Sequence, residues 1–398
     1  MTNSDRVTAG DRYLRHDLID WFDQARVHAS RVAVIGAGAI GNEVVKNLAL
    51  LGVGNIDVFD FDRIEIHNLT RGVFFREEDV GRSKVEVVAE RAGALDPNVT
   101  ITPIEGDFWD TLGLTRLRSY DCVIAAVDNF EARIRLNQMC ALTGVALVNA
   151  GIDSRYASVE VFPSMAGCAC YECHLPASAY ARIAERYSCG WLKRRGHAER
   201  KIPTTTITAS FAGALAASAA LRLGGELTQS RRVLFDTLAG SSSVSNLVRQ
   251  ADCVGCGRFE SRPRIVPGLP ILTAQLTPAD QRDVAIELSD PIIAAWRCSR
   301  CGNESRAAEL TGRRASDFDD AITLCERCNA HSVHVEIRDQ FSLGELQALF
   351  ELIGRSERFS LSASSESRPL SVKYVLASIG GERLCIDLHG GRNDERSQ

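Results

Sequence analysis

A glycine-rich turn between an apolar run and a helical pattern constrains the fold of this chain more than any other feature. Residues 32–35 read Val-Ala-Val-Ile, which predicts a strand. Gly36, Gly38 and Gly41 follow at once, and residues 42–51 carry apolar side chains at helical spacing. Glycines let a backbone approach a phosphate, and a helix N-terminus offers unpaired N–H groups with partial positive charge. The pattern therefore predicts a nucleotide-binding strand, turn and helix within an α/β fold.

An aspartate ends the next predicted strand. Residues 56–60 read Ile-Asp-Val-Phe-Asp, so that Asp60 closes a second apolar run. In a dinucleotide fold, an acid at this place binds the ribose hydroxyls of NAD. An NAD oxidoreductase is therefore one interpretation, although no candidate pair of hydride-site residues accompanies the glycines.

Further charged and amide residues in the predicted loops favour a triphosphate over a dinucleotide. A triphosphate needs Lys or Arg on its oxygens and a carboxylate to hold Mg²⁺, whereas a nicotinamide has little use for more cations. Each residue alone is as consistent with a solvated loop charge. Together they predict an ATP and Mg²⁺ site. The set consists of Asp62, Asn68, Arg71, Lys84, Asp128 and Asn129.

The order of these motifs resembles that of the ubiquitin-activating superfamily. That superfamily includes the bacterial adenylyltransferases that activate sulfur carriers for thiamine and molybdopterin synthesis. The resemblance covers about residues 11–257, and it implies a Rossmann-like adenylation domain with a largely parallel sheet. The motifs that carry it are Arg-Tyr-Leu-Arg-His at 12–16, the glycines, the stretch 60–71, Gly-Arg-Ser-Lys at 81–84, Val-Asp-Asn at 127–129 with Arg133 after it, and paired Cys-x-x-Cys.

The resemblance implies a role for each polar residue of the set. Asp60 would hold the ribose, and Asp128 would hold Mg²⁺. Asn68, Arg71 and Lys84 would bind the phosphates. These roles together imply a site for ATP with Mg²⁺.

The reaction implied by the resemblance is acyl adenylation. The C-terminal carboxylate of a ubiquitin-like protein ending in glycine attacks the α-phosphate of ATP, and pyrophosphate leaves. Because the attacking carboxylate is already ionised, catalysis is mainly positioning and neutralisation of phosphate charge. Arg15 matches an arginine that reaches across a dimer into the partner's ATP site, which implies a homodimer.

Length and composition agree with such an enzyme and exclude other classes. A chain of 398 residues with 45% hydrophobic content is long enough for two or three domains. No apolar run approaches a membrane span, and the N-terminal residues lack a signal-peptide core. We therefore expect a cytoplasmic protein that uses no membrane. A net charge of −5 and a pI near 6.0 give no electrostatic case for nucleic acid.

Thirteen cysteines in a chain without a secretion signal favour metal binding and catalysis over disulfides. Two Cys-x-x-Cys motifs lie far apart in the sequence, and the resemblance implies that they close one structural zinc site. Two more have the local spacing of a zinc ribbon. The alternative for either set is a redox pair, but neither has the strand-to-helix context of a thioredoxin motif. The expected Zn²⁺ ligands are Cys170, Cys173, Cys253 and Cys256 in the first site, and Cys298, Cys301, Cys325 and Cys328 in the second.

Cys189 is the candidate nucleophile among the remaining cysteines. It lies in a charged segment where side chains such as Arg194 favour a thiolate. The resemblance places a thioester-forming or sulfur-transferring cysteine in this crossover region, about residues 174–203. Ubiquitin-activating enzymes usually place it directly before a threonine, whereas here Pro203 precedes Thr204. Cys189 is therefore either this nucleophile or an inert surface thiol.

The remainder of the chain predicts a separate C-terminal module. Residues 1–258 would form the adenylation domain, and prolines interrupt any long element in 259–290, which we expect to be a linker. Residues 291–398 would combine the zinc ribbon with a small α/β fold. A Ser-x-x-Glu capping box at 342–345 predicts a helix start, and Gly-Gly at 380–381 predicts a hairpin. We expect this module to dock a protein partner.

Three functions remain open. The first is an activating enzyme that adenylates a ubiquitin-like protein, forms a thioester on Cys189 and passes the protein to a conjugating enzyme. A zinc ribbon beside an adenylation domain suggests that such an enzyme would serve a bacterial conjugation system. The second is an adenylyltransferase that serves a sulfur carrier or a peptide without a thioester of its own. The third is a zinc-ribbon binding scaffold.

Overall fold

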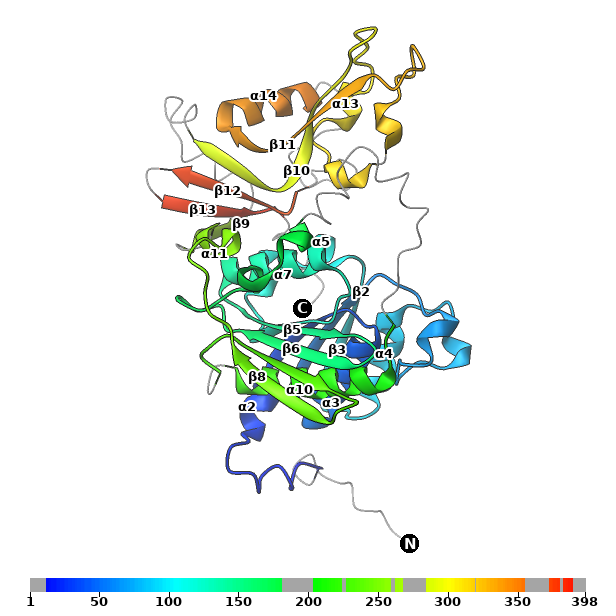
Figure 1. The fold of residues 1–398 in the computed structure, drawn as a ribbon, viewed down its shortest axis with the longest axis vertical. Coiled ribbons are helices and arrows are strands. Elements are labelled where there is room, and N and C mark those ends of the chain that lie inside the picture. The colour runs from blue at the N-terminus through cyan, green and yellow to red at the C-terminus, as the bar shows by residue number, and fades with distance from the viewer. Residues whose placement is uncertain are drawn as a thin grey trace. The chain divides into compact units, whose positions relative to one another are not determined.

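The chain forms an α/β structure with two compact units (Figure 1). The computed structural model describes residues 12–180, 203–223, 227–258, 262–267, 284–318, 320–354, 372–379 and 382–388. Within these residues, one unit is built on an eight-stranded sheet and the other on a five-stranded sheet. The predicted fold class is confirmed.

The first unit alternates strands and helices over its N-terminal half, as βαβ units do. Its strands are β1 (Arg31–Ile35), β2 (Asn55–Asp60), β3 (Thr100–Glu105), β4 (Cys122–Ala125), β5 (Ala146–Ile152), β6 (Tyr156–Phe162), β7 (Arg231–Asp236) and β8 (Ser241–Asn246). Its α-helices are α2 (Gln24–Ala29), α3 (Ala39–Leu51), α4 (Lys84–Gly93), α5 (Phe108–Thr111), α6 (Leu114–Leu117), α7 (Phe130–Thr143), α10 (Thr206–Arg222) and α11 (Val254–Arg258). Its 3₁₀ turns are η1 (Ile66–Asn68), η2 (Glu77–Asp79) and η3 (Tyr171–His174).

The large sheet has the order β3-β2-β1-β4-β5-β6-β7-β8. All pairs from β3 to β5 are parallel, and the pairs from β5 to β8 are antiparallel. In the sheet, β2 and β3 lie on one side of β1, and β4 and β5 lie on its other side, so the strand order reverses at β1. Open α/β sheets bind ligands at such a switch point, beyond the carboxyl ends of the strands. The topology therefore places the binding edge after β1, β2 and β4.

Helices cover both faces of the large sheet (Figure 1). α3 and α10 pack against each other, and α10 also packs on β5 and β6. α7 contacts β4 and β5, and Figure 1 draws α5 and α7 on the opposite side of the sheet from α3 and α10. Alanines of α10 and valines of α3 and α4 join the strand side chains in one core cluster. Because this core is apolar and close-packed, it holds the strand ends in fixed positions.

The second unit is a smaller sheet with one main helix. Its strands are β9 (Arg264–Pro267), β10 (Ala285–Cys298), β11 (Val333–Ser342), β12 (Tyr374–Ile379) and β13 (Glu382–Asp387), in the order β11-β10-β12-β13-β9. Its helical elements are α13 (Ala307–Leu310), α14 (Leu343–Gly354), and the 3₁₀ turns η5 (Ala315–Asp317) and η6 (Asp320–Thr323). Leucines of α14 pack on apolar residues of β10 and β12 to form its core.

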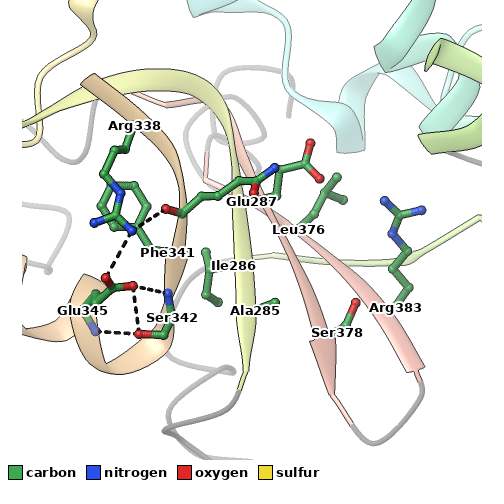
Figure 2. A pocket seen from close by; sticks show the side chains of 11 residues that line it. Ala285, Ile286, Glu287, Arg338, Phe341, Ser342, Glu345, Leu376, Ser378 and Arg383 are labelled. Carbon is green, nitrogen blue, oxygen red and sulfur yellow. Dashed lines mark hydrogen bonds and ion pairs between the residues drawn. The ribbon is translucent and has the colours of Figure 1, made fainter. Parts of the chain in front are cut away.

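Local signals in the sequence of this unit match its structure. Ser342 Oγ accepts a hydrogen bond from the Glu345 N–H, and Glu345 Oε2 accepts one from the Ser342 N–H at 2.7 Å, as a capping box requires (Figure 2). β12 and β13 pair antiparallel on either side of 380–381. The stretch 259–290, which the sequence suggests as a linker, contributes β9 and the start of β10. β9 is an edge strand, the position in a sheet where a proline is tolerated.

Membrane insertion has no support among the described helices. None of them has both the length and the apolar character that crossing a bilayer needs.

Candidate nucleotide and zinc sites

The three glycines at the junction of β1 and α3 are needed for different structural reasons. Gly36 has a φ of +101°, and a Cβ there would lie 2.6 Å from the Ala126 carbonyl oxygen. A Cβ on Gly41 would lie 1.9 Å from the Gly36 carbonyl oxygen. These two glycines therefore close the turn against itself and against the end of β4. Around Gly38, by contrast, no heavy atom beyond Gly38 and its two chain neighbours lies within 4 Å of the Cβ position, which leaves room for a ligand.

The N-terminus of α3 has no side-chain cap, because its N-cap residue is Gly38. First-turn N–H groups of a helix lack intrahelical partners. The open space at Gly38 and these N–H groups form the kind of cradle that a phosphate or a sugar oxygen occupies.

Asn42 fixes the shape of this turn, and sequence reasoning missed it. Its Nδ2 donates to the Ala37 carbonyl at 2.7 Å, and its Oδ1 accepts from the Phe74 N–H at 3.0 Å. The side chain is fully buried. Asn42 therefore ties the glycine turn to the loop after η1, which carries Arg71. The only signal in the sequence is an amide placed directly after the third glycine.

Asp60 lies at the end of β2 and contacts the glycine turn. Its Oδ2 accepts from the Ala37 N–H at 2.7 Å, and its Oδ1 accepts from the Asp62 N–H at 2.8 Å. Burial raises the pKa of Asp60, although Lys84 and these two N–H groups oppose that shift. The bond from the Ala37 N–H places Asp60 directly beside the glycine turn, as the sequence predicts.

Lys84 opens α4 and pairs with Asp62. Its Nζ lies 2.6 Å from Asp62 Oδ2, and its side chain is 9% exposed whereas that of Asp62 is 51% exposed. The ammonium group is thus held near Asp60 and the glycine turn by an ion pair with a solvated partner. A phosphate that replaced Asp62 would meet a cation already in place.

Asn68 and Arg71 lie at η1 and in the loop after it, and both are half-buried. Asn68 Oδ1 accepts from the Glu65 N–H at 3.0 Å, and Arg71 Nη1 donates to the His67 carbonyl at 3.0 Å. Both bonds stay within this one stretch of chain. The remaining donors of the Arg71 guanidinium have no protein partner among the described residues.

Asp128 and Asn129 follow β4. Asp128 is exposed, and its one described hydrogen bond is a long one of 3.4 Å from Asn129 Nδ2. Asn129 Oδ1 accepts from the Ala132 N–H at 2.8 Å and so caps α7. Because the Gly36 Cβ position lies 3.5 Å from the Val127 nitrogen, the loop that carries Asp128 adjoins the glycine turn.

Arg15 lies apart from these residues in the contacts of a single chain. It is exposed, and no described residue gives it a hydrogen bond or an ion pair. Its segment is nevertheless anchored, because the Tyr13 hydroxyl donates to Asp96 and His16 Nδ1 lies 2.7 Å from Gln24 Oε1. Arg15 is therefore presented to solvent from a fixed segment.

The first expected zinc set is brought together within the first unit. Ligand atoms of Cys170, Cys173, Cys253 and Cys256 all lie within 4.8 Å of one another. The Sγ–Sγ distances are 3.7 Å for Cys170–Cys253, 3.5 Å for Cys173–Cys256 and 4.0 Å for Cys170–Cys173. Four thiolates at about 2.3 Å from a zinc ion form a tetrahedron with edges of about 3.8 Å. The cluster therefore fits Zn²⁺.

A family model confirms the resemblance that the motifs suggest. The model of the ThiF family matches residues 11–254, which is more than half of the chain. The chain belongs to the ThiF family. The match contains every residue of the predicted ATP site and three of the four cysteines of the first cluster, and it ends two residues before Cys256.

Curated relatives carry the names of activating enzymes and adenylyltransferases. The SAMP-activating enzyme E1 of Haloferax volcanii is 37% identical over 38% of this ThiF chain and 57% of its own length. The SUMO-activating enzyme subunit 2 of Dictyostelium discoideum is 34% identical over 37% of this chain and 22% of its own length. The sulfur carrier protein adenylyltransferase of Thermus thermophilus is 31% identical over 64% of this chain and 94% of its own length. The chain thus spans little more than half of the first relative and about a fifth of the second.

Solved structures agree on the fold. E. coli MccB with ATP is 25% identical to this chain, with a TM-score of 0.51, and the match covers 63% of this chain and 75% of MccB. A second MccB structure, with AMPCPP and MccA, matches at 24% identity with a TM-score of 0.51.

The second cysteine set lies beyond the ThiF match, in the second unit. Ligand atoms of Cys298, Cys301, Cys325 and Cys328 also lie within 4.8 Å of one another. The Sγ–Sγ distances are 3.7 Å for Cys298–Cys328 and 3.6 Å for Cys301–Cys325, so that this cluster fits a tetrahedral Zn²⁺ as well. Gly302 follows the first pair with a φ of +67°, which explains the glycine at that turn.

Cys189 lies outside the described residues, as does most of the expected crossover region 174–203. The proposed role of this cysteine therefore rests on its position in the sequence and on the family resemblance.

Proposed function

We propose that this ThiF protein is an ATP-dependent adenylyltransferase that activates the C-terminal carboxylate of a ubiquitin-like protein. One observation carries the proposal. The glycine turn, Asp60, the Lys84–Asp62 pair and the loop of Asp128 meet at the switch point of the sheet. This arrangement combines a phosphate cradle, a cation and acids, which is the equipment that a nucleoside triphosphate needs.

In the proposed reaction the protein positions groups and compensates charge. Asp60 accepts hydrogen bonds from the ribose, and the cradle at Gly38 lets the nucleotide approach the backbone. Lys84, Arg71 and Asn68 bind the phosphates. Asp128 would hold Mg²⁺, which neutralises phosphate oxygens when bound. The substrate carboxylate then attacks the α-phosphate, and the bond to pyrophosphate breaks.

Two further elements of the proposal concern the quaternary state and the second step. Arg15 would enter the ATP site of the partner in a homodimer, which agrees with its exposed position on an anchored segment. Cys189 would then attack the acyl adenylate, form a thioester and release AMP. A conjugating enzyme would receive the activated protein from this thioester, and the second unit would dock that partner.

A second candidate is an adenylyltransferase for a sulfur carrier, without a thioester of its own. The observation that favours it is the match to the Thermus thermophilus sulfur carrier protein adenylyltransferase over 94% of that relative's length. The two candidates share the first reaction and differ in the fate of the acyl adenylate.

The first reaction is tested by exchange of labelled pyrophosphate into ATP with Mg²⁺ and a panel of ubiquitin-like and sulfur-carrier proteins. Exchange that depends on a protein with a C-terminal glycine supports adenylation. Lys84→Ala should lose exchange, whereas Lys46→Ala, which removes an ion pair with Glu43 within α3, should keep it. Absence of exchange with every partner would favour the scaffold interpretation.

The second step is tested by intact mass under non-reducing conditions. A partner-sized adduct that thiols release, and that Cys189→Ala lacks, would support the activating enzyme. An AMP-linked partner without an enzyme adduct would support the sulfur-carrier adenylyltransferase instead.

A further inference from the structure

A polar row crosses the large sheet next to Asp128. Asn149 on β5 lies directly opposite Glu160 on β6, and Glu160 lies directly opposite Arg232 on β7. Asn149 Nδ2 donates to Glu160 Oε2 at 2.7 Å, and Arg232 Nε donates to Glu160 Oε1 at 2.7 Å. Asn149 and Glu160 are 6% and 7% exposed. Because buried polar groups are costly unless they are bonded, such a row is held in one arrangement.

Arg133 of α7 joins this row to the loop of Asp128. Its Nη1 donates to Asn149 Oδ1, and its Nη2 donates to the carbonyl of Val127, the residue before Asp128. α7 is capped by Asn129, so that Arg133 stands one turn into a helix that begins at the same loop. The guanidinium therefore fastens the backbone next to Asp128 to the interior of the sheet.

The chemistry of this contact requires an arginine. A guanidinium offers several donors in a rigid plane and can hold two acceptors in fixed directions, whereas a lysine ammonium is a point charge on a flexible stem. Burial lowers the pKa of Arg133, and the nearby Tyr171, Glu160 and Asp128 oppose that shift. The charge is thus kept in a half-buried place by acids on both sides, one in the row and one in the loop.

We propose that Arg133 is a positioning residue that holds the Asp128 carboxylate in the orientation needed for a divalent cation, with Asn149, Glu160 and Arg232 fixing the guanidinium. The inference rests on the proposed function, in which Asp128 is the cation ligand. Arg133 itself touches neither the cation nor the nucleotide in this proposal. Its effect should therefore appear in cation affinity and not in nucleotide affinity without metal.

The test measures binding of Mn²⁺ to the full chain in the presence of ATP, from the loss of the free Mn²⁺ signal in electron paramagnetic resonance beyond the loss that the same Mn²⁺ and ATP show without protein. For Arg133→Lys we expect a Mn²⁺ dissociation constant about tenfold higher than wild type, the size of effect expected when one charge-assisted hydrogen bond is lost. The ATP dissociation constant of the variant without metal, measured by equilibrium dialysis, should stay within about twofold of the wild-type value. At Mn²⁺ concentrations well above its dissociation constant, Arg133→Lys should bind as much Mn²⁺ per chain as the wild type.

Arg135→Lys is the matched control. Arg135 lies on the same helix, pairs with Glu131 of α7 and lies over the Trp109 ring of α5, so that these contacts do not involve the loop of Asp128. The Mn²⁺ affinity of Arg135→Lys should equal that of wild type.

Glu160→Gln is the second variant, in case Arg133→Lys folds poorly. It keeps the shape of the row but removes the charge opposite Arg232, so that it should weaken Mn²⁺ binding by a smaller factor.

The outcomes separate this inference from the proposed function. Equal Mn²⁺ affinity in wild type, Arg133→Lys and Glu160→Gln would overturn the positioning role, and so would an equal loss in Arg133→Lys and Arg135→Lys. A wild type that binds no Mn²⁺ with ATP would also overturn it. Pyrophosphate exchange by the wild type decides the proposed function independently of all these results.

Discussion

At the scale of single residues, Asp57 illustrates how a buried charge is stabilised in this fold. It lies on β2 and is 2% exposed. Its Oδ2 accepts from the Tyr120 hydroxyl at 2.5 Å, from Arg116 Nη2 at 2.9 Å and from Arg31 Nη2 at 3.0 Å. Burial alone would raise the pKa of Asp57, but these donors outweigh it and hold that pKa below its usual value.

Asp57→Asn should lower the stability of the protein by about 3–5 kcal/mol at neutral pH, because it breaks a buried charge cluster and leaves two cations unpaired. The sign of the pH dependence follows from the depressed pKa. The stabilisation is fully present above the unfolded pKa of about 3.9, and it disappears as the pH falls through the lower folded value. Urea unfolding of both proteins at several pH values checks this. A gap between them that widens as the pH falls would contradict the assignment.

Asp128 differs from Asp57, because it is exposed and its one described hydrogen bond is the long one from Asn129. Asp128→Ala should abolish adenylation while it leaves the melting temperature and the zinc content unchanged. Pyrophosphate exchange, thermal melts and metal analysis on the same preparation measure the three properties. Glu86→Ala is the control, because Glu86 of α4 is exposed. Asp121→Ala is not suitable, because Asp121 accepts a hydrogen bond from the Arg31 N–H. Full exchange activity in Asp128→Ala would remove this residue from the site.

At the scale of elements, the first cysteine cluster joins η3 to α11. It also adjoins α7, because Asn137 Nδ2 donates to Glu172 Oε1 at 3.1 Å and Asn137 Oδ1 accepts from the Tyr171 N–H at 3.0 Å. α7 thus links three places, with its cap Asn129 at the loop of Asp128, Arg133 at the polar row and Asn137 at the cluster. The helix connects the first cysteine cluster to the binding edge of the sheet.

Cys253→Ser should reduce zinc from two ions per chain to one, and it should lower the melting temperature of the first unit, because structural zinc contributes directly to folding. Metal analysis together with thermal melts measures this. Cys385→Ser is the comparison, since Cys385 is a buried thiol of β13 outside both clusters. It should keep both ions. Retention of two ions in Cys253→Ser would show that this cysteine is not a ligand.

Sequence reasoning found the elements whose signals are local. The glycine turn, the capping box at Ser342 and the hairpin after β12 each depend on residues a few positions apart, and each Cys-x-x-Cys motif pairs its own two ligands. The polar row was not found, because Asn149, Glu160 and Arg232 meet only through the register of three strands. The same holds for the donors around Asp57, which come from distant segments.

At the scale of the whole molecule, the proposed homodimer makes each ATP site depend on two chains. Arg15→Ala and Lys84→Ala should each be inactive alone. Mixed dimers should regain part of the activity, because one of the two sites then has both the lysine and the partner's arginine. Co-expression with two different tags, followed by pyrophosphate exchange on the doubly purified protein, measures this. Failure of the mixture would mean that Arg15 acts within its own chain or not at all.

The first cysteine cluster has a topological consequence for the chain. It ties Cys170 to Cys253 and Cys173 to Cys256, residues that are 83 positions apart, and the expected crossover region lies between them. Once a metal ion closes this loop, a protease cut inside it does not release a fragment, because both ends remain held at one point. A nicked protein would migrate as one particle under native conditions, because β7 also pairs with β6 and α10 also packs on α3 and on the sheet. The cluster thus allows this region to be cleaved, or lengthened by insertion, at little cost in chain entropy, since the closure cost grows only slowly with loop length.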